Sequence, residues 1–339
     1  MKFDLRLYFQ NNKPLYIQIS EAIVNLISQK RLQLGDRIPS ISKLSEEYLL
    51  SKDTVERAYK DLMKKGIITS VKGKGYFINK VDVVKTLRVL IIFNKLSPHK
   101  KQVYDGIVKT LGSDAIIDLS VHHSNLEVLN IIINKSQGLY DYYMIMPHFY
   151  EDSERAAEII AQLDKDRVII LDKQIKNFNH IYSAVYQDFE KDIFEALIDG
   201  LSLLNKYKKL ILIFPKMVLY PTEIAKGFKL FSNSHNFEFE IIHGIETSVK
   251  IDKGDAYVVI EETDLVTLVK ICKQNDFKAG KDIGILSYND TPIKEILLEG
   301  ITVISTDHFL MGVTAAKLIL EARHGFIKNP FSLIRRNSL

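Results

Sequence analysis

The 339-residue sequence lacks the features of several large protein classes. It contains no run of about 18 apolar residues, so we expect no membrane-spanning helix. Cys272 is the only cysteine, which excludes a disulfide framework and is typical of a reducing cytoplasm. Residues 1–14 contain neither a long apolar stretch nor a small-residue cleavage site, so we expect no signal peptide. These absences predict a cytoplasmic globular protein.

Motifs for catalysis and for metal binding are missing too. The sequence has no Gly-x-Ser-x-Gly elbow and no Gly-Lys-Ser/Thr of a Walker-type loop. Its histidines show no spacing with carboxylates that would define a zinc site. We therefore expect no catalytic residue, no metal and no cofactor, and we do not expect an enzyme.

The charges present are unevenly placed. Residues 1–80 hold fifteen Lys and Arg against eight Asp and Glu, a net charge of +7, so the rest of the chain carries −3 of the total of +4. A basic small domain on a mildly acidic large one is typical of a nucleic-acid-binding module attached to a domain that does not touch nucleic acid. A basic surface that serves only solubility would look similar.

Residues 15–79 predict three helices followed by a β-hairpin. Apolar residues recur at helical spacing in "LYIQISEAIVNLISQ" and in "KDTVERAYKDLMKK". Ser40 and Ser51 are placed to cap the second and third helices, and Gly66 to end the third. Two helices joined by a tight turn indicate a helix-turn-helix, whose second helix enters the major groove of DNA. The other interpretation is a three-helix bundle with an ordinary solvated face.

The run "VKGKGYFIN" supports the first interpretation. A dinucleotide fingerprint needs three spaced glycines followed by a helix, whereas here Gly73 and Gly75 are followed by a β-prone run. Two glycines at a hairpin tip permit a tight reversal. Lys72 and Lys74 would then project toward DNA phosphates.

From Leu87 onward the pattern alternates between strands and helices. Expected strands are residues 87–93, 115–121, 140–146, 167–172, 183–188, 209–214, 237–243, 255–260, 283–288 and 301–307. Most are continuous apolar runs, as strands buried on both faces should be. The clearest helix is 189–205. This is the pattern of a parallel α/β fold, and its length predicts two sheets.

The first eighty residues resemble the winged helix-turn-helix of the GntR family of bacterial transcriptional regulators. The matching pieces are "PLYIQISEAIVNLI", "GDRIPSISKLSEEY", "LSKDTVERAYKDLMKKGII" and "KGKGYFI". Lys52, and Ser42 or Lys43, stand where the family often has Arg, and Glu56 stands where Arg often follows Thr-Val. Since Lys presents a point charge and Arg a bidentate fork, base readout should differ. The expected DNA-binding residues are Lys43, Lys52, Asp53, Thr54, Arg57, Lys72 and Lys74.

The remaining residues resemble the effector-binding domain of the LacI family, which has the periplasmic sugar-binding-protein fold. The landmarks are "VYQDFEKDIFEAL", "IAKGFKLF", "GILSYNDTPIKEIL", "ITVISTDHFLMGVTAAKLIL" and "SLIRRNSL". The resemblance implies two α/β lobes, with chain crossovers near 186–190, near 287–291 and within 308–318. It also implies a sugar or sugar derivative as ligand. The expected ligand-binding residues are Asn94, Lys95, His148, Asp172, Asp188 and Asn289, although Asp188 and Asp290 could instead be helix N-caps.

Together these patterns predict a winged helix-turn-helix over residues 1–79, a linker over 80–86, and a two-lobed effector-binding and dimerisation domain over 87–339. We expect a ligand-responsive transcriptional regulator that binds a palindromic double-stranded DNA operator as a homodimer. GntR-type modules are also fused to pyridoxal-phosphate aminotransferase-like domains, so such a regulator or enzyme is the alternative. A binding protein that has lost operator recognition is a third possibility.

Overall fold

The structure is a computed structural model that describes residues 3, 5, 7, 13–81, 86–149, 153–175, 182–215 and 220–339. The chain packs as two compact units. The first comprises Met1–Ile91, Gly112–Ser120 and Glu127–Tyr143, and the second comprises Ile92–Leu111, Val121–Leu126 and Met144–Leu339. Within the predicted linker, residues 82–85 lie outside the described residues.

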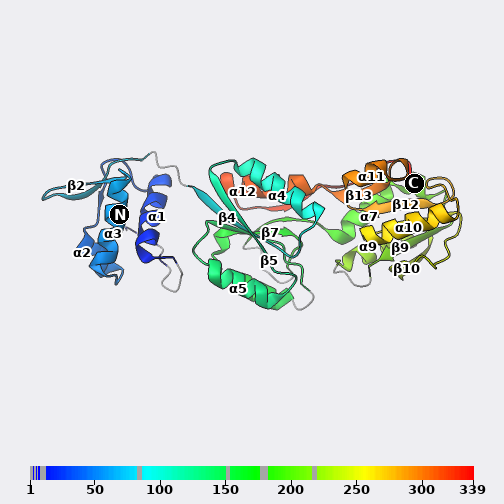
Figure 1. Cartoon of the computed structure of the whole chain (residues 1–339), viewed down its shortest axis with the longest axis horizontal. Helices are drawn as coiled ribbons and strands as arrows, with labels where there is room; N and C mark the ends of the chain where they lie inside the picture. The colour runs from blue at the N-terminus through cyan, green and yellow to red at the C-terminus, as the bar shows by residue number, and fades with distance from the viewer. Residues whose placement is uncertain are drawn as a thin grey trace. The chain divides into compact units, whose positions relative to one another are not determined.

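The first unit begins with three helices and a small sheet (Figure 1). Their bounds are α1 (Leu15–Ser28), β1 (Arg37–Ile38), α2 (Ile41–Glu47), α3 (Lys52–Lys64), β2 (Ile68–Val71) and β3 (Gly75–Ile78). The Ser40 side chain accepts a hydrogen bond from the Lys43 backbone N–H, and Ser51 accepts one from that of Thr54, so both predicted N-caps are confirmed. The apolar faces of the helices meet in one core that contains the fully buried Tyr59.

The predicted hairpin is confirmed, and a third strand joins it. Strands β2 and β3 pair antiparallel, and β1 pairs with the other side of β3. Gly73 and Gly75 have φ angles of 76° and 106°, a region in which a side chain would be strained. The two glycines therefore set the tight reversal that carries Lys72 and Lys74.

Two six-stranded sheets form the rest of the molecule. One has the order β14-β8-β7-β6-β4-β5 and the other β10-β9-β11-β12-β13-β15. In the second sheet the neighbouring strands run parallel except β15, which is antiparallel to β13. The strands are β4 (Leu87–Phe93), β5 (Ala115–Val121), β6 (Tyr142–Ile145), β7 (Val168–Asp172), β8 (Ser183–Tyr186), β9 (Lys209–Phe214), β10 (Glu238–His243), β11 (Asp255–Val259), β12 (Gly284–Tyr288), β13 (Thr302–Thr306), β14 (Phe326–Lys328) and β15 (Phe331–Ile334).

Helices cover these sheets because the strands are apolar on both faces. Strands β7, β12 and β13 are buried along their whole length. The helices are α4 (Pro98–Leu111), α5 (Leu126–Ser136), α6 (Ser153–Ile160), η1 (Lys165–Arg167), α7 (Phe189–Asp199), α8 (Leu201–Leu204), α9 (Glu223–Ser234), α10 (Glu262–Gln274), α11 (Pro292–Ile296), η2 (Leu297–Glu299) and α12 (His308–Leu320). None of the described helices combines the length and the apolar composition that a membrane crossing requires.

Two expectations about this region are wrong in detail. The helix predicted over 189–205 is divided into α7 and α8 at Gly200, which caps α7. Residues 287–291 are not a crossover between the sheets, because β12 and β13 on either side pair with each other. The chain passes between the sheets after β8, between β13 and α12 at Asp307, and between β14 and β15 at residues 329–330.

Helices α4 and α12 lie side by side (Figure 1). Their backbones approach so closely that a Cβ added to Gly106 would lie 2.3 Å from the Phe309 carbonyl oxygen. A Cβ on Gly312 would lie 2.1 Å from that of Val103. Both positions therefore require glycine, and the start of each helix is held in a fixed place beside the other.

Candidate functional site

The first turn of α3 presents a polar surface. Lys52 and Asp53 are exposed there, and Thr54 is half-buried, with its hydroxyl 2.7 Å from that of Ser51. Val55, Ala58, Tyr59 and Leu62 anchor the opposite face of the helix in the core. A helix held in this way by its apolar face can offer its first turn to the major groove.

The hairpin tip adds two exposed lysines, Lys72 and Lys74. In the described part of the chain, no carboxylate lies within 4 Å of either ammonium group, and the same holds for Lys43 and Lys52. Lys60 and Lys65, by contrast, are paired with Glu56 and Asp61 at 2.7 Å. These four lysines thus have charge available for phosphates.

Two arginines of this region have defined contacts. The guanidinium of Arg57 stacks on the Tyr16 ring of α1 at 4.0 Å from its centroid. This contact fixes Arg57 on the α1 side of α3. Arg37, which sequence reasoning did not select, is exposed and packs against Gly75 of the hairpin. The motif "GDRIP" contained the signal for it, but its position next to the hairpin depends on the β1–β3 pairing.

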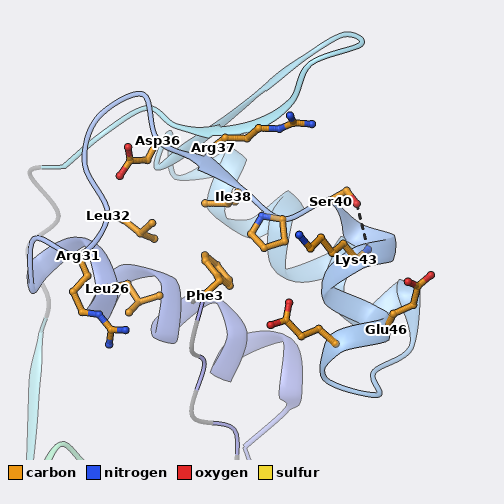
Figure 2. Close-up of a pocket in the computed structure, with 12 residues that line it drawn as sticks. Phe3, Leu26, Arg31, Leu32, Asp36, Arg37, Ile38, Ser40, Lys43 and Glu46 are labelled. Atoms are coloured by element: carbon orange, nitrogen blue, oxygen red, sulfur yellow. Dashed lines mark hydrogen bonds between the residues drawn. The ribbon is translucent and has the colours of Figure 1, made fainter. Parts of the chain in front are cut away.

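A cavity of about 960 Å³ opens between α1, β1 and α2. Figure 2 shows Phe3, Leu26 and Leu32 close together on one side, with Lys43 and Glu46 coming from α2. Lys43 is therefore at the edge of this cavity, whereas Lys52, Asp53 and Thr54 share one turn of α3.

A second cavity, of about 160 Å³, lies wholly within the second unit. Residues that follow strands of both six-stranded sheets line it, at the carboxyl ends where α/β sheets bind ligands. Five of the six expected ligand-binding residues are among them: Asn94, Lys95, His148, Asp172 and Asn289. The sixth, Asp188, is exposed, caps α7 and is not among the lining residues.

Asp172 is the centre of a buried polar network in this cavity. Its Oδ2 accepts hydrogen bonds from Lys100 Nζ at 2.9 Å and from His148 Nε2 at 2.8 Å. Its Oδ1 accepts one from the Gln187 amide. All four side chains are at least nine-tenths buried, so the network holds a carboxylate and an ammonium out of water in fixed positions.

The protonation states follow from these contacts. Burial would raise the pKa of the Asp172 carboxyl, but Lys100 and His148 hold it well below its usual range. Burial lowers the pKa of His148 despite its contact with Asp172. At neutral pH Asp172 is therefore ionised and His148 is neutral, with the Nε2 proton donated to the carboxylate.

Several other polar atoms that line the cavity are buried without a hydrogen-bond partner among the described residues. They are Asn94 Oδ1, His99 Nδ1, Gln187 Oε1, Glu261 Oε2, the Tyr288 hydroxyl and Asn289 Oδ1. A buried polar group without a partner costs about 1–3 kcal/mol. Convergence of such groups on one cavity indicates a site built for a ligand with many hydrogen-bonding groups.

Sequence reasoning missed Lys100, Gln187, Tyr288 and Lys294, which also line the cavity. Lys294 is only 2% exposed, although "TPIKEIL" looks like an ordinary surface segment. Nothing in the sequence separates Lys100 from its exposed neighbour Lys101. Asp290, a possible N-cap, instead forms a two-pronged ion pair with Arg336 at 2.9 and 2.8 Å.

The N-terminal residues of this chain resemble known proteins. The sequence model described as "Bacterial regulatory proteins, gntR family" matches residues 15–78. The uncharacterized HTH-type transcriptional regulator YhcF of Bacillus subtilis is 31% identical over 104 residues, which cover 30% of this chain and 79% of that protein.

Solved structures resemble the larger part. The trehalose repressor from Escherichia coli matches with a TM-score of 0.60 and 12% identity, covering 74% of this chain and all of that one. A periplasmic binding protein/LacI transcriptional regulator from Alkaliphilus metalliredigens, complexed with D-xylulofuranose, matches with a TM-score of 0.56 and 14% identity over 74% of this chain and 98% of that one. At these identities the likeness shows the two-lobed fold of such proteins.

Proposed function

This chain belongs to the gntR family of bacterial regulatory proteins, and we propose that it regulates transcription in response to a sugar or sugar derivative. The ligand would bind in the cavity around Asp172. The observation that carries this proposal is the set of unpartnered polar atoms converging on that cavity in a chain that also has a winged helix-turn-helix.

On the DNA side, Lys72 and Lys74 would contact phosphates, and Lys52, Asp53 and Thr54 would contact base edges in the major groove. Lys43 and Arg57 would add contacts at the edge of the protein–DNA interface. Two copies would bind a palindromic operator in the cytoplasm, because a two-fold protein matches a two-fold site. We propose residues 1–79 as the DNA-binding domain, 80–86 as the linker and 87–339 as the effector-binding and dimerisation domain.

On the ligand side, the amide oxygens of Asn94, Gln187 and Asn289 would accept hydrogen bonds from hydroxyl groups. The cavity is smaller than the roughly 300–1,000 Å³ of drug-sized sites, which favours a small ligand. Asp172, Lys95 and His148 would complete the site. Asp188 would stabilise the start of α7 as its N-cap. The proposed role is binding without catalysis. The ligand would change DNA affinity through its different affinities for two arrangements of the protein.

The salt dependence of DNA binding tests whether the β2–β3 hairpin, the wing of the helix-turn-helix, contacts DNA. Binding to DNA from upstream of the gene should weaken steeply with salt, and Lys72→Ala with Lys74→Ala should reduce the slope of log K against log salt by about 2, since each phosphate contact contributes about 0.9. Lys317→Ala, an exposed lysine of α12, is the matched control. An unchanged slope in the double variant would show that the wing does not contact DNA phosphates.

Ligand linkage tests the effector cavity. A sugar that binds only the folded protein should raise the melting temperature, by an amount that grows with its concentration. Asn94→Ala should abolish the shift, because it removes an unpartnered acceptor that lines the cavity. If a broad sugar panel gave no shift, the proposed ligand class would be wrong.

A further inference from the structure

Lys294 is the buried cation of the effector cavity whose charge has no acidic partner. It is 2% exposed, and its Nζ donates to the carbonyl oxygens of Tyr288 at 3.0 Å and Asn289 at 2.7 Å. An ammonium group has three donors, so one remains after these two bonds. A buried charge that is hydrogen-bonded only to neutral groups is still costly, because carbonyl dipoles do not neutralise it.

The charged groups near Lys294 do not pair with it. Within the described part of the chain, no carboxylate oxygen lies within 4.0 Å of Lys294 Nζ. Glu262, Asp290 and Glu261 lower the cost of its charge from a greater distance, and Arg336 raises it. Asp290 is held by Arg336 in a two-pronged ion pair.

The other lysines of the cavity differ from Lys294. Lys100 is neutralised by Asp172, and Lys95 is exposed, with its Nζ 5.5 Å from the centre of the Tyr220 ring. A counter-charge supplied by the ligand would therefore gain most at Lys294, where water does not screen it.

Resting on the proposed function, we infer that the effector is a polyhydroxylated anion, a sugar carrying one phosphate or carboxylate group, and that this group pairs with Lys294. The hydroxyls donate to the unpartnered oxygens of Asn94, Gln187 and Asn289, and the anionic group receives the remaining Lys294 proton donor. Both halves of the ligand thus match groups that the protein leaves without partners.

A matched ligand panel on the full chain tests this. Glucose, fructose and ribose are compared by calorimetry with their phosphate esters, and with gluconate and glucuronate as carboxylate forms. We expect an anionic member to bind at least tenfold more tightly than its neutral counterpart, and the two sets of anions show whether phosphate or carboxylate is preferred. In Lys294→Met that preference should fall about ten- to hundredfold, the value of one hydrogen bond to a charged group. Lys270→Met, an exposed lysine of α10, should leave it unchanged.

A pH profile of the wild-type protein keeps the inference testable if Lys294→Met fails to fold. Burial lowers the pKa of Lys294 to about 8, so deprotonation removes the charge as the pH rises. Carboxylate ligands stay ionised from pH 7 to 9, and their affinity should fall about tenfold over that range. A flat profile contradicts the inference.

The outcomes are distinguishable. Tighter binding of a neutral sugar, or an anion preference that survives Lys294→Met, overturns the anionic ligand and leaves the sugar-responsive regulator standing. Failure of every neutral and anionic sugar to bind overturns the sugar effector itself, and the present inference with it.

Discussion

At the scale of single residues, Asp172 holds together the polar side of the effector cavity. Asp172→Asn removes the carboxylate that compensates Lys100, so the ammonium is left buried without a counter-charge. Breaking a buried ion pair in this way costs about 3–5 kcal/mol. Denaturant unfolding should show this loss. Asp188→Asn is the control, because Asp188 is exposed and Asn is an equally good N-cap. Similar stability losses in the two variants would contradict the central role of Asp172.

Buried histidines make stability depend on pH. Burial lowers the pKa of His99 and His122 to about 4 and that of His308 to about 3. The unfolded chain binds these protons near pH 6.5, so the folded state binds fewer protons below that pH. The contribution of these histidines to the free energy of unfolding is therefore fully present above about pH 6.5. It falls as the pH drops, by up to about 1.4 kcal/mol per pH unit for each histidine.

Urea unfolding at pH 7, 6 and 5, followed by circular dichroism, measures this loss. His99→Gln should make the profile less steep, because one of these histidines no longer takes up a proton on unfolding. A free energy of unfolding that stays constant between pH 7 and 5 would show that these histidines are not buried as described.

At the scale of elements, the crossing of α4 and α12 sets where His99, Lys100 and His308 stand. Gly106→Ala and Gly312→Ala would each place a Cβ against backbone that cannot move aside. We expect each to destabilise the protein by about 1–3 kcal/mol, the usual cost of overpacking. Gly200→Ala is the matched control, because its Cβ would meet no atom closer than 3.4 Å. Thermal unfolding should separate the two classes, and equal melting temperatures would refute the close crossing.

Elements were more predictable from the sequence than the cavity was. Apolar runs predicted strands 87–93, 115–121 and 209–214 to the residue. Strands 87–93 and 209–214 are buried along most of their length, whereas 115–121 is partly exposed. Strands β14 and β15 were missed, since "FIK" and "FSLI" are short and half exposed. The cavity includes Lys294, whose burial depends on the fold around β12 and which no local pattern signals.

At the scale of the whole effector region, Asn329 joins the three crossovers. Its backbone N–H donates to Tyr186 O at 2.7 Å, and its Nδ2 donates to Thr306 Oγ1 and Asp307 O at 2.7 and 2.8 Å. It is 1% exposed. Asn329→Ala should lower the free energy of unfolding by about 1–3 kcal/mol, because it removes two side-chain hydrogen bonds that contribute about 0.5–1.5 kcal/mol each. Denaturant unfolding beside Asn337→Ala, which removes one exposed bond to Glu299 O, measures the difference. Equal losses of unfolding free energy in the two variants would show that Asn329 does not join the crossovers.

The left-handed backbone at two cavity residues limits how the ligand preference of this protein can change. Asp172 and Asn289 have φ angles of 73° and 60°, a conformation that Asn, Asp and Gly tolerate best and β-branched residues resist. In a library randomised over the whole cavity, most substitutions at these two positions would be lost through misfolding before any ligand could select them. New ligand specificities would instead arise from substitutions at lining residues with negative φ angles. Asp172 and Asn289 would stay unchanged while the other lining residues vary.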